Sequence, residues 1–168
     1  EMYRGDSFQV VVDKPEYALA IAIALRAKLK AETPDGQKLW DARLAVGVGD
    51  ISFENDNIVT SDGEAFRLSG HSFDHIGKKR LSISTPWPDF NTNIELVTRF
   101  ADDLITSWTA KQARVVYQSM LFPKLQKDLA EELDMTRQNF NYHWGSARGQ
   151  LILDYIEYFK SLISKYIR

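Results

Sequence analysis

The chain has 168 residues, enough for one ordinary domain or two small ones, and its 44% apolar and 12% aromatic content argues against disorder of the whole chain. It contains no cysteine, which excludes disulfides, thiol nucleophiles and cysteine zinc sites. The net charge of −2 divides into −4 over residues 1–95 (11 basic against 15 acidic) and +2 over residues 96–168 (10 basic against 8 acidic), so only the second part is mildly basic.

Strands and helices are expected to alternate through the first half of the chain. In order, the elements are a strand over Phe8–Val12, a helix over 13–31, a strand over Ala42–Phe53, a helix from Ser61 to Gly77 and a strand over Arg80–Thr85. Asp13 is a suitable N-cap for the first helix, and Ser61 with Glu64 has the spacing of a capping box. Gly47 and Gly49 in the middle strand predict close approach by another backbone or by a ligand.

Helices are expected throughout the second half. They cover Asn93–Trp108, Thr109–Met120, Lys124–Leu133, Thr136–Ser146 and a closing segment through Ile167. Pro86-Trp87-Pro88 marks the domain boundary. The pattern predicts an α+β protein, with an α/β domain over residues 1–88 and an all-α domain over residues 89–168 that contains a helix-turn-helix at 124–148.

The helix-turn-helix prediction depends on one small residue between two short helices. Ala130 allows the helices to cross closely, Met135 fills the turn, and Thr136 can cap the second helix. The core-facing side chains are Leu129 and Leu133 from the first helix and Phe140 and Trp144 from the second. The turn position that glycine often takes is Asp134, which tolerates a left-handed conformation.

The outward face of the second helix carries polar side chains that can contact base edges or phosphates in a major groove. The predicted DNA-binding residues are Lys124, Thr136, Arg137, Gln138, Asn141, Tyr142 and Arg148. Asp128, Glu131 and Glu132 place negative charge on the first helix. The alternative is a helical bundle that uses the same arrangement for packing or dimerisation.

Three segments in order resemble motifs of the bacterial SatD family: residues 4–9 (RGDSFQ), residues 43–51 (RLAVGVGDI) and residues 61–66 (SDGEAF). The resemblance covers most of the chain. It implies a cyclase-like or GGDEF-like palm of ferredoxin-like topology, followed by a helix-turn-helix. It implies architecture more than activity.

The palm resemblance also implies a candidate metal residue. In class III cyclases, the Gly-Asp that corresponds to Gly5-Asp6 carries one of two aspartates that hold two divalent cations. The partner of Asp6 would lie on a first strand that this sequence lacks, so the alternative, a hairpin residue that satisfies turn amides, is favoured here. No cofactor is expected, and magnesium or manganese would bind only in a completed palm.

Other features carry weaker signals. His71 and His75 have a metal-ligand spacing without a clear third ligand, and His143 is expected to contact phosphate or to pack. The closing helix has a wide apolar stripe that suits a core or a dimer interface.

The sequence thus predicts a DNA-binding regulator with a palm-derived sensor domain. Its expected partners are double-stranded DNA, a second copy of the chain and a nucleotide ligand. The alternatives are a nucleotidyl cyclase-like enzyme that needs the missing strand, and a non-catalytic dimerisation scaffold. No apolar stretch approaches the roughly 20 residues that span a bilayer, and no signal-peptide pattern opens the chain. A cytoplasmic location without membrane contact is therefore expected.

Overall fold

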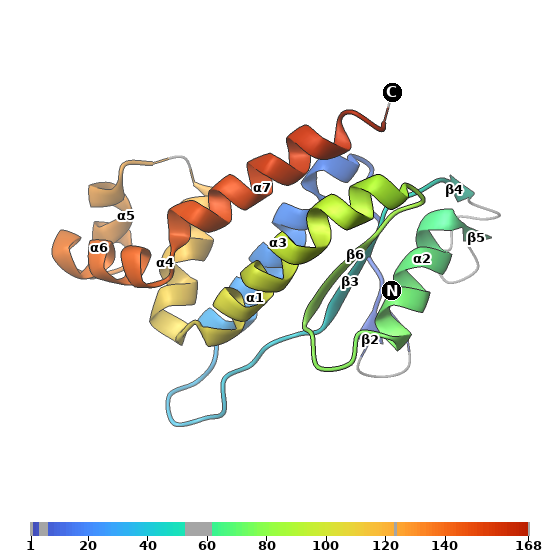
Figure 1. The fold of residues 1–168 in the computed structure, drawn as a ribbon. Coiled ribbons are helices and arrows are strands. Elements are labelled where there is room, and N and C mark those ends of the chain that lie inside the picture. Colours follow the sequence, from blue (N-terminus) through green and yellow to red (C-terminus); the bar gives the residue numbers. More distant parts are fainter. Residues whose placement is uncertain (1, 4–6, 53–61, 123, 168) are drawn as a thin grey trace.

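The computed structural model describes residues 2–3, 7–52, 62–122 and 124–167 (Figure 1). Within these ranges the chain is an α+β protein dominated by helices, as its sequence predicts. Asp6, the candidate metal residue, and Ser61, the predicted capping residue, lie outside them.

The described strands are short and form three pairs. One antiparallel pair joins β1 (Met2–Tyr3) to β2 (Ser7–Phe8), and another joins β4 (Ile51–Ser52) to β5 (Asp62–Gly63). The third pair is parallel and joins β3 (Leu44–Gly47) to β6 (Leu81–Ser84), with Leu44 opposite Leu81. The strand predicted over Phe8–Val12 extends only to Phe8, and the strand predicted over Ala42–Phe53 is divided between β3 and β4.

Two helices of the first half lie near β3 and β6. A 3-10 turn, η1 (Pro15–Tyr17), leads into α1 (Ala18–Ala31), and α2 (Glu64–Asp74) precedes β6. The prediction that Asp13 caps the first helix is wrong. The 3-10 turn has Lys14 at its N-cap, with no side-chain hydrogen bond there.

Gly47 explains how α2 lies directly on β3. A Cβ atom at position 47 would come within 2.2 Å of the Ala65 carbonyl oxygen and 2.7 Å of the Ser69 amide nitrogen. No other residue fits there without movement of the helix backbone. The close backbone approach that was predicted at this glycine is confirmed.

Five helices make up the described part of the second half. They are α3 (Pro88–Ser107), α4 (Ala110–Leu121), α5 (Gln126–Glu132), α6 (Arg137–Ser146) and α7 (Gly149–Ile163). α3 begins five residues before the predicted start, because Pro88 occupies the first turn of the helix, where its missing N–H costs no hydrogen bond. α4 begins with a capping box between Thr109 and Gln112.

One large apolar cluster joins the two halves. The cluster contains buried side chains from α1, α3 and α7, among them Leu19, Ile23, Ala27, Phe90, Ile94 and Phe159. Side chains on both sides of residue 88 therefore share one core. Figure 1 shows α7 and α3 side by side, with α1 beneath them and α4, α5 and α6 at one end. Across the described residues, none of the helices combines the length and the apolar character that crossing a bilayer requires.

Candidate functional site

Helices α5 and α6 form a compact unit around a second, smaller apolar cluster. This cluster consists of Val115 from α4, Leu129 and Ala130 from α5, and Phe140 from α6, with Leu133, Met135 and Trp144 packed against it. Ala130 is buried between the helices, as its predicted role requires. α4 supplies Val115, so the unit contains three helices rather than the two that the sequence indicated.

The turn between α5 and α6 is held by its backbone and one side chain. Asp134 adopts a left-handed conformation with φ of 51°, and the Met135 amide donates to the Ala130 carbonyl oxygen at 3.0 Å. The Thr136 hydroxyl then accepts from the Asn139 amide at 3.1 Å and caps α6, which confirms the predicted cap. These bonds determine which side of α6 turns away from the core.

The outward side of α6 carries most of the predicted DNA-binding residues. Arg137, Gln138, Asn141 and Tyr142 are all exposed, while Phe140 on the opposite side is fully buried. Adjacent turns of the helix carry Arg137 and Asn141, which are four residues apart, and the same spacing relates Gln138 to Tyr142. The N-terminal residues of α6 thus offer guanidinium, amide and phenol groups to solvent.

Three predicted residues occupy other positions. The Lys124 ammonium pairs with the Glu132 carboxylate and lies over the Phe122 ring, so part of its charge is already neutralised. The Thr136 hydroxyl is engaged in capping. Arg148 is exposed beyond the end of α6, where it starts α7 in a left-handed conformation with φ of 55°.

Residues 124–148 carry no net charge, because Lys124, Lys127, Arg137 and Arg148 balance Asp128, Glu131, Glu132 and Asp134. The two signs are nevertheless separated, since three of the four acidic residues lie on α5 and none lies on α6. Burial, with a smaller contribution from the Lys111 charge on α4, lowers the pKa of His143 from its usual 6.5. The imidazole is therefore neutral at pH 7 and adds no charge to α6.

Lys111 is a cation near α6 that the sequence did not single out. It lies exposed in the first turn of α4 and acts on His143 of α6. Because the two residues are 32 positions apart in the chain, only the packing of α4 against α6 brings them together. The helical face thus has one more candidate phosphate contact than the sequence indicated.

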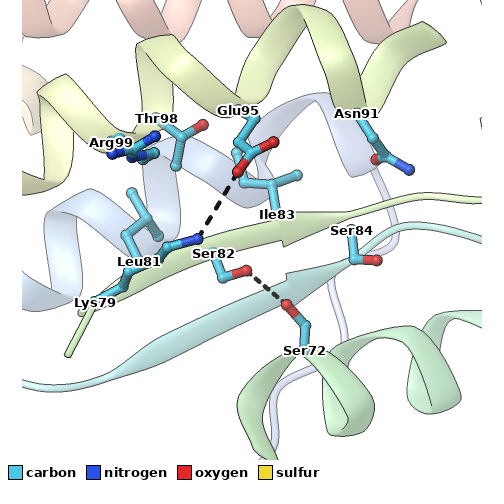
Figure 2. A pocket seen from close by; sticks show the side chains of 10 residues that line it. All are labelled: Ser72, Lys79, Leu81, Ser82, Ile83, Ser84, Asn91, Glu95, Thr98 and Arg99. Atoms are coloured by element: carbon cyan, nitrogen blue, oxygen red, sulfur yellow. Dashed lines mark hydrogen bonds and ion pairs between the residues drawn. The ribbon is translucent and has the colours of Figure 1, made fainter. Parts of the chain in front are cut away.

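A polar pocket of about 220 Å³ lies between α2, β6 and α3 (Figure 2). Its lining includes the hydroxyls of Ser72, Ser82 and Ser84, and Ser72 and Ser82 are hydrogen-bonded at 2.6 Å. Lys79 and Arg99 add positive charge at the same pocket, and Lys79 lies 4.0 Å from the Glu95 carboxylate. This combination of hydroxyls and cations suits a small ligand that carries an anionic group.

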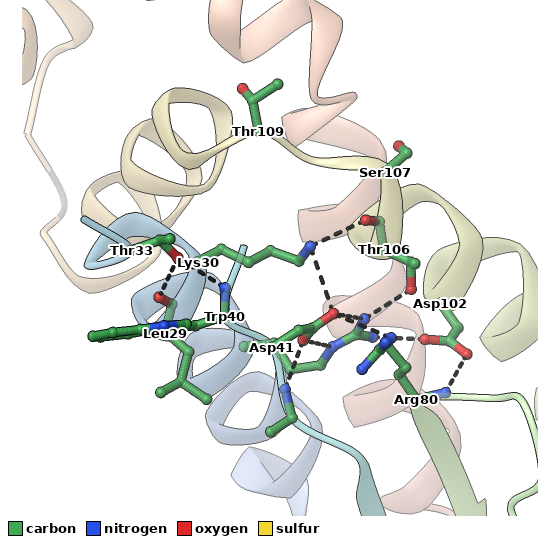
Figure 3. Close-up of polar contacts among 12 residues, drawn as sticks. Leu29, Lys30, Thr33, Trp40, Asp41, Arg80, Asp102, Thr106, Ser107 and Thr109 are labelled. Carbon is green, nitrogen blue, oxygen red and sulfur yellow. Dashed lines mark hydrogen bonds and ion pairs between the residues drawn. The ribbon is translucent and has the colours of Figure 1, made fainter. Parts of the chain in front are cut away.

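A buried network of charged groups joins α1, α3 and the segment before β3 (Figure 3). The Arg26 guanidinium donates to both carboxylate oxygens of Asp41 at 2.9 Å and to Asp102 at 2.6 Å. Lys30 donates to the Thr106 carbonyl oxygen at 3.0 Å and lies 3.5 Å from Asp41. Asp102 also accepts from the Arg80 amide at 2.8 Å.

This network stabilises the contact between α1, α3 and the segment before β3. Within the described residues, no buried side-chain nitrogen or oxygen lacks a hydrogen-bond partner, so each buried polar atom of the network is bonded within the protein. Burial lowers the pKa of Lys30, and the Asp41 carboxylate opposes part of that effect. Sequence reasoning missed the whole network, because Arg26 and Asp102 are 76 residues apart.

The two histidines of α2 contact each other. Their rings lie 4.3 Å apart between centroids, and the His75 Nδ1 is hydrogen-bonded to the His71 carbonyl oxygen at 2.8 Å. Among the described residues, no group of three or more His, Asp and Glu side chains is arranged to hold a metal ion. Within the described residues, this pair therefore has no third metal ligand beside it.

Comparisons of the chain with family models, with curated proteins and with solved structures give no match. A functional assignment for this chain therefore depends on its own sequence and geometry.

Proposed function

We propose that the chain is a DNA-binding regulatory protein in which α5 and α6 form a helix-turn-helix. The observation that carries this proposal is the outward placement of Arg137, Gln138, Asn141 and Tyr142 on α6, opposite the buried Phe140. Guanidinium and carboxamide groups at the start of an exposed helix are the groups that recognise base edges and phosphates in a major groove.

The local packing supports the same proposal. A recognition helix has to be presented rigidly, because contacts to bases require a defined orientation. α6 is capped by Thr136, held by Phe140 in the smaller cluster, and followed by Ala147, whose carbonyl oxygen accepts from the Trp108 Nε1 at 2.9 Å.

The first part of the chain is proposed to act as a sensor derived from a ferredoxin-like, SatD-type palm, in a cytoplasmic protein. The polar pocket between α2, β6 and α3 supports this assignment. Its serine hydroxyls and the charge of Lys79 suit the phosphate of a nucleotide. α3, which lines the pocket, belongs to the core cluster that also contains α7.

The test is salt-dependent binding to duplex DNA. Arg137→Ala and Gln138→Ala are each expected to weaken binding about 5- to 100-fold, the range for losing one base or phosphate contact. With about four cations near α6, the logarithm of the affinity should fall against the logarithm of salt concentration with a slope of roughly −3 to −4 per protomer. Fluorescence anisotropy with labelled random-sequence and genomic fragments measures both quantities.

Lys38→Ala is the matched control, since it removes one exposed positive charge from the loop after α1. Its affinity for DNA should equal that of the wild type. If duplex DNA at 20 mM salt gives no measurable binding, or if Lys38→Ala weakens binding as much as Arg137→Ala does, the helix-turn-helix proposal is wrong.

A further inference from the structure

Helices α3 and α7 carry an apolar surface that no described part of the chain covers. Phe100 and Leu96 of α3 are 66% and 57% exposed, and Leu151 of α7 is 56% exposed. Val97 and Tyr158 are also exposed. Isolated exposed apolar residues are ordinary, but five large ones on two adjacent helices mark an interaction surface.

Helical spacing places the five side chains in a stripe along the outward sides of the two helices. Leu96 and Phe100 are one turn apart on α3, and Leu151 and Tyr158 are two turns apart on α7. The Thr98 and Tyr155 hydroxyls are hydrogen-bonded at 2.7 Å, which holds the two helices together. The Trp108 side chain at the end of α3 donates to Ala147 just before α7, so the helices are antiparallel (Figure 1).

Charged residues beside this stripe indicate which partner it fits. Arg99 and Asp103 lie one turn apart on the same flank of α3, both exposed, and neither has an ion-pair partner among the described residues. When two copies of a helix pack antiparallel about a two-fold axis, each flank meets the same flank of its partner. An axis close to Phe100 then brings Arg99 of one copy to Asp103 of the other, twice.

We propose that this surface of α3 and α7 is the interface of a two-fold homodimer in which the two copies of α3 run antiparallel. Phe100 packs near the axis, Leu96 faces the Leu104 region of the second copy, and Arg99 pairs with Asp103. Helices of 20 and 15 residues, with a rise of ~1.5 Å per residue and ~10 Å between axes, present a face of roughly 25 by 20 Å. This face is about 500 Å² per copy, or about 1,000 Å² for the pair, which reaches the lower limit for a biological interface.

The arrangement has a consequence for DNA binding. α6 ends beside Trp108, at the C-terminal end of α3, so antiparallel pairing places the two copies of α6 at opposite ends of the dimer. With the axis near Phe100, the two Trp108 positions lie about 24 Å apart along the helix direction, the same order as one turn of DNA, about 34 Å. This consequence depends on the proposed function, whereas dimerisation itself does not.

Sedimentation equilibrium of the full chain, without DNA, tests the proposal. The wild type is expected to be a dimer at micromolar concentration and Phe100→Glu a monomer at the same concentration. Trp40→Glu is the matched control, because it places a carboxylate on another exposed aromatic residue that belongs to neither α3 nor α7, and it should remain a dimer. Circular dichroism on each variant verifies that the fold is retained.

Charge reversal tests the antiparallel register. Arg99→Asp and Asp103→Arg should each weaken dimerisation at least about tenfold, because each places like charges together at two symmetric positions. The double variant restores both pairs and should return to within about threefold of the wild type. A monomeric wild type, a dimeric Phe100→Glu, or a double variant no better than the single ones would each overturn the proposal, whether or not the protein binds DNA.

Discussion

Arg26 shows how one residue can connect distant parts of this chain. Its side chain is fully buried, and its guanidinium bonds to Asp41, Asp102 and Thr106. A buried guanidinium is costly unless its donors are satisfied, and here the two carboxylates lie within 2.9 Å of it. In the sequence, Arg26 is simply one more residue of an apolar helix, and nothing nearby identifies its partners.

Arg26→Leu should destabilise the protein by about 3–5 kcal/mol, because it leaves two buried carboxylates without their main cation. Lys28→Ala is the control two residues further along α1, where the ammonium pairs with exposed Glu32 and lies 5.2 Å from the centre of the Tyr117 ring. That change should cost about 1 kcal/mol or less. Urea denaturation followed by circular dichroism compares the two, and equal effects would contradict the structural role of Arg26.

Asp41 should make stability depend on pH. Burial raises the pKa of this carboxyl, but the hydrogen bonds and charge of Arg26, together with the charge of Lys30, outweigh burial and hold it below 3.8. The folded state then binds fewer protons than the unfolded state, so this stability is complete above about pH 4 and declines as the pH falls further.

Asp41→Asn removes that carboxyl while keeping the shape of the side chain. The variant should be less stable than the wild type at pH 7, and the difference should shrink between about pH 4 and pH 2. Denaturant titrations across this range give the free energy of unfolding of each protein. A difference that stays constant down to pH 2 would show that Asp41 does not contribute through its charge.

At the scale of elements, the junction of α6 and α7 is especially tight. A Cβ atom at Gly149 would lie 2.3 Å from the Trp144 ring, whereas a Cβ atom at Gly145 would meet no atom within 4 Å. The sequence places both glycines in the same short segment and does not distinguish them. Only the packing of Trp144 against the start of α7 separates their roles.

Gly149→Ala is therefore expected to destabilise the protein by about 1–3 kcal/mol, because the Trp144 ring has to move. Gly145→Ala, inside α6 with open space around it, should stabilise by about 0.5–1 kcal/mol through its better helix propensity. Thermal unfolding of the two variants measures the contrast. Two shifts of the same sign would contradict this account of the junction.

Helix positions were the most predictable feature, because periodic apolar residues and local caps are encoded within a few positions. Thr136 capping α6 and Ala130 buried beside it follow from such short patterns. The strands were predicted too long. Val10 to Val12 are apolar and β-branched but have no strand beside them within the described residues, and pairing with a partner strand is a non-local property.

At the scale of the whole molecule, the sequence could identify which residues are buried but not what they are buried against. Pro86-Trp87-Pro88 has the composition of a linker, yet Trp87 packs against the main cluster and its ring lies 5.2 Å from that of Tyr166. α1 likewise contacts α4, with the Arg114 guanidinium donating to the Ala31 carbonyl oxygen at 2.9 Å. The polar pocket depends on such distant contacts and was not predictable as a site. The apolar stripe of the closing helix was visible in the sequence, but its position beside α3 was not.

Trp144 packs against both apolar clusters, the large one that contains α1, α3 and α7 and the small one beneath α6. Its indole therefore couples α6 to α7, and the two helices are expected to move together. In the proposed dimeric regulator, a change at the sensor would then alter the distance between the two copies of α6.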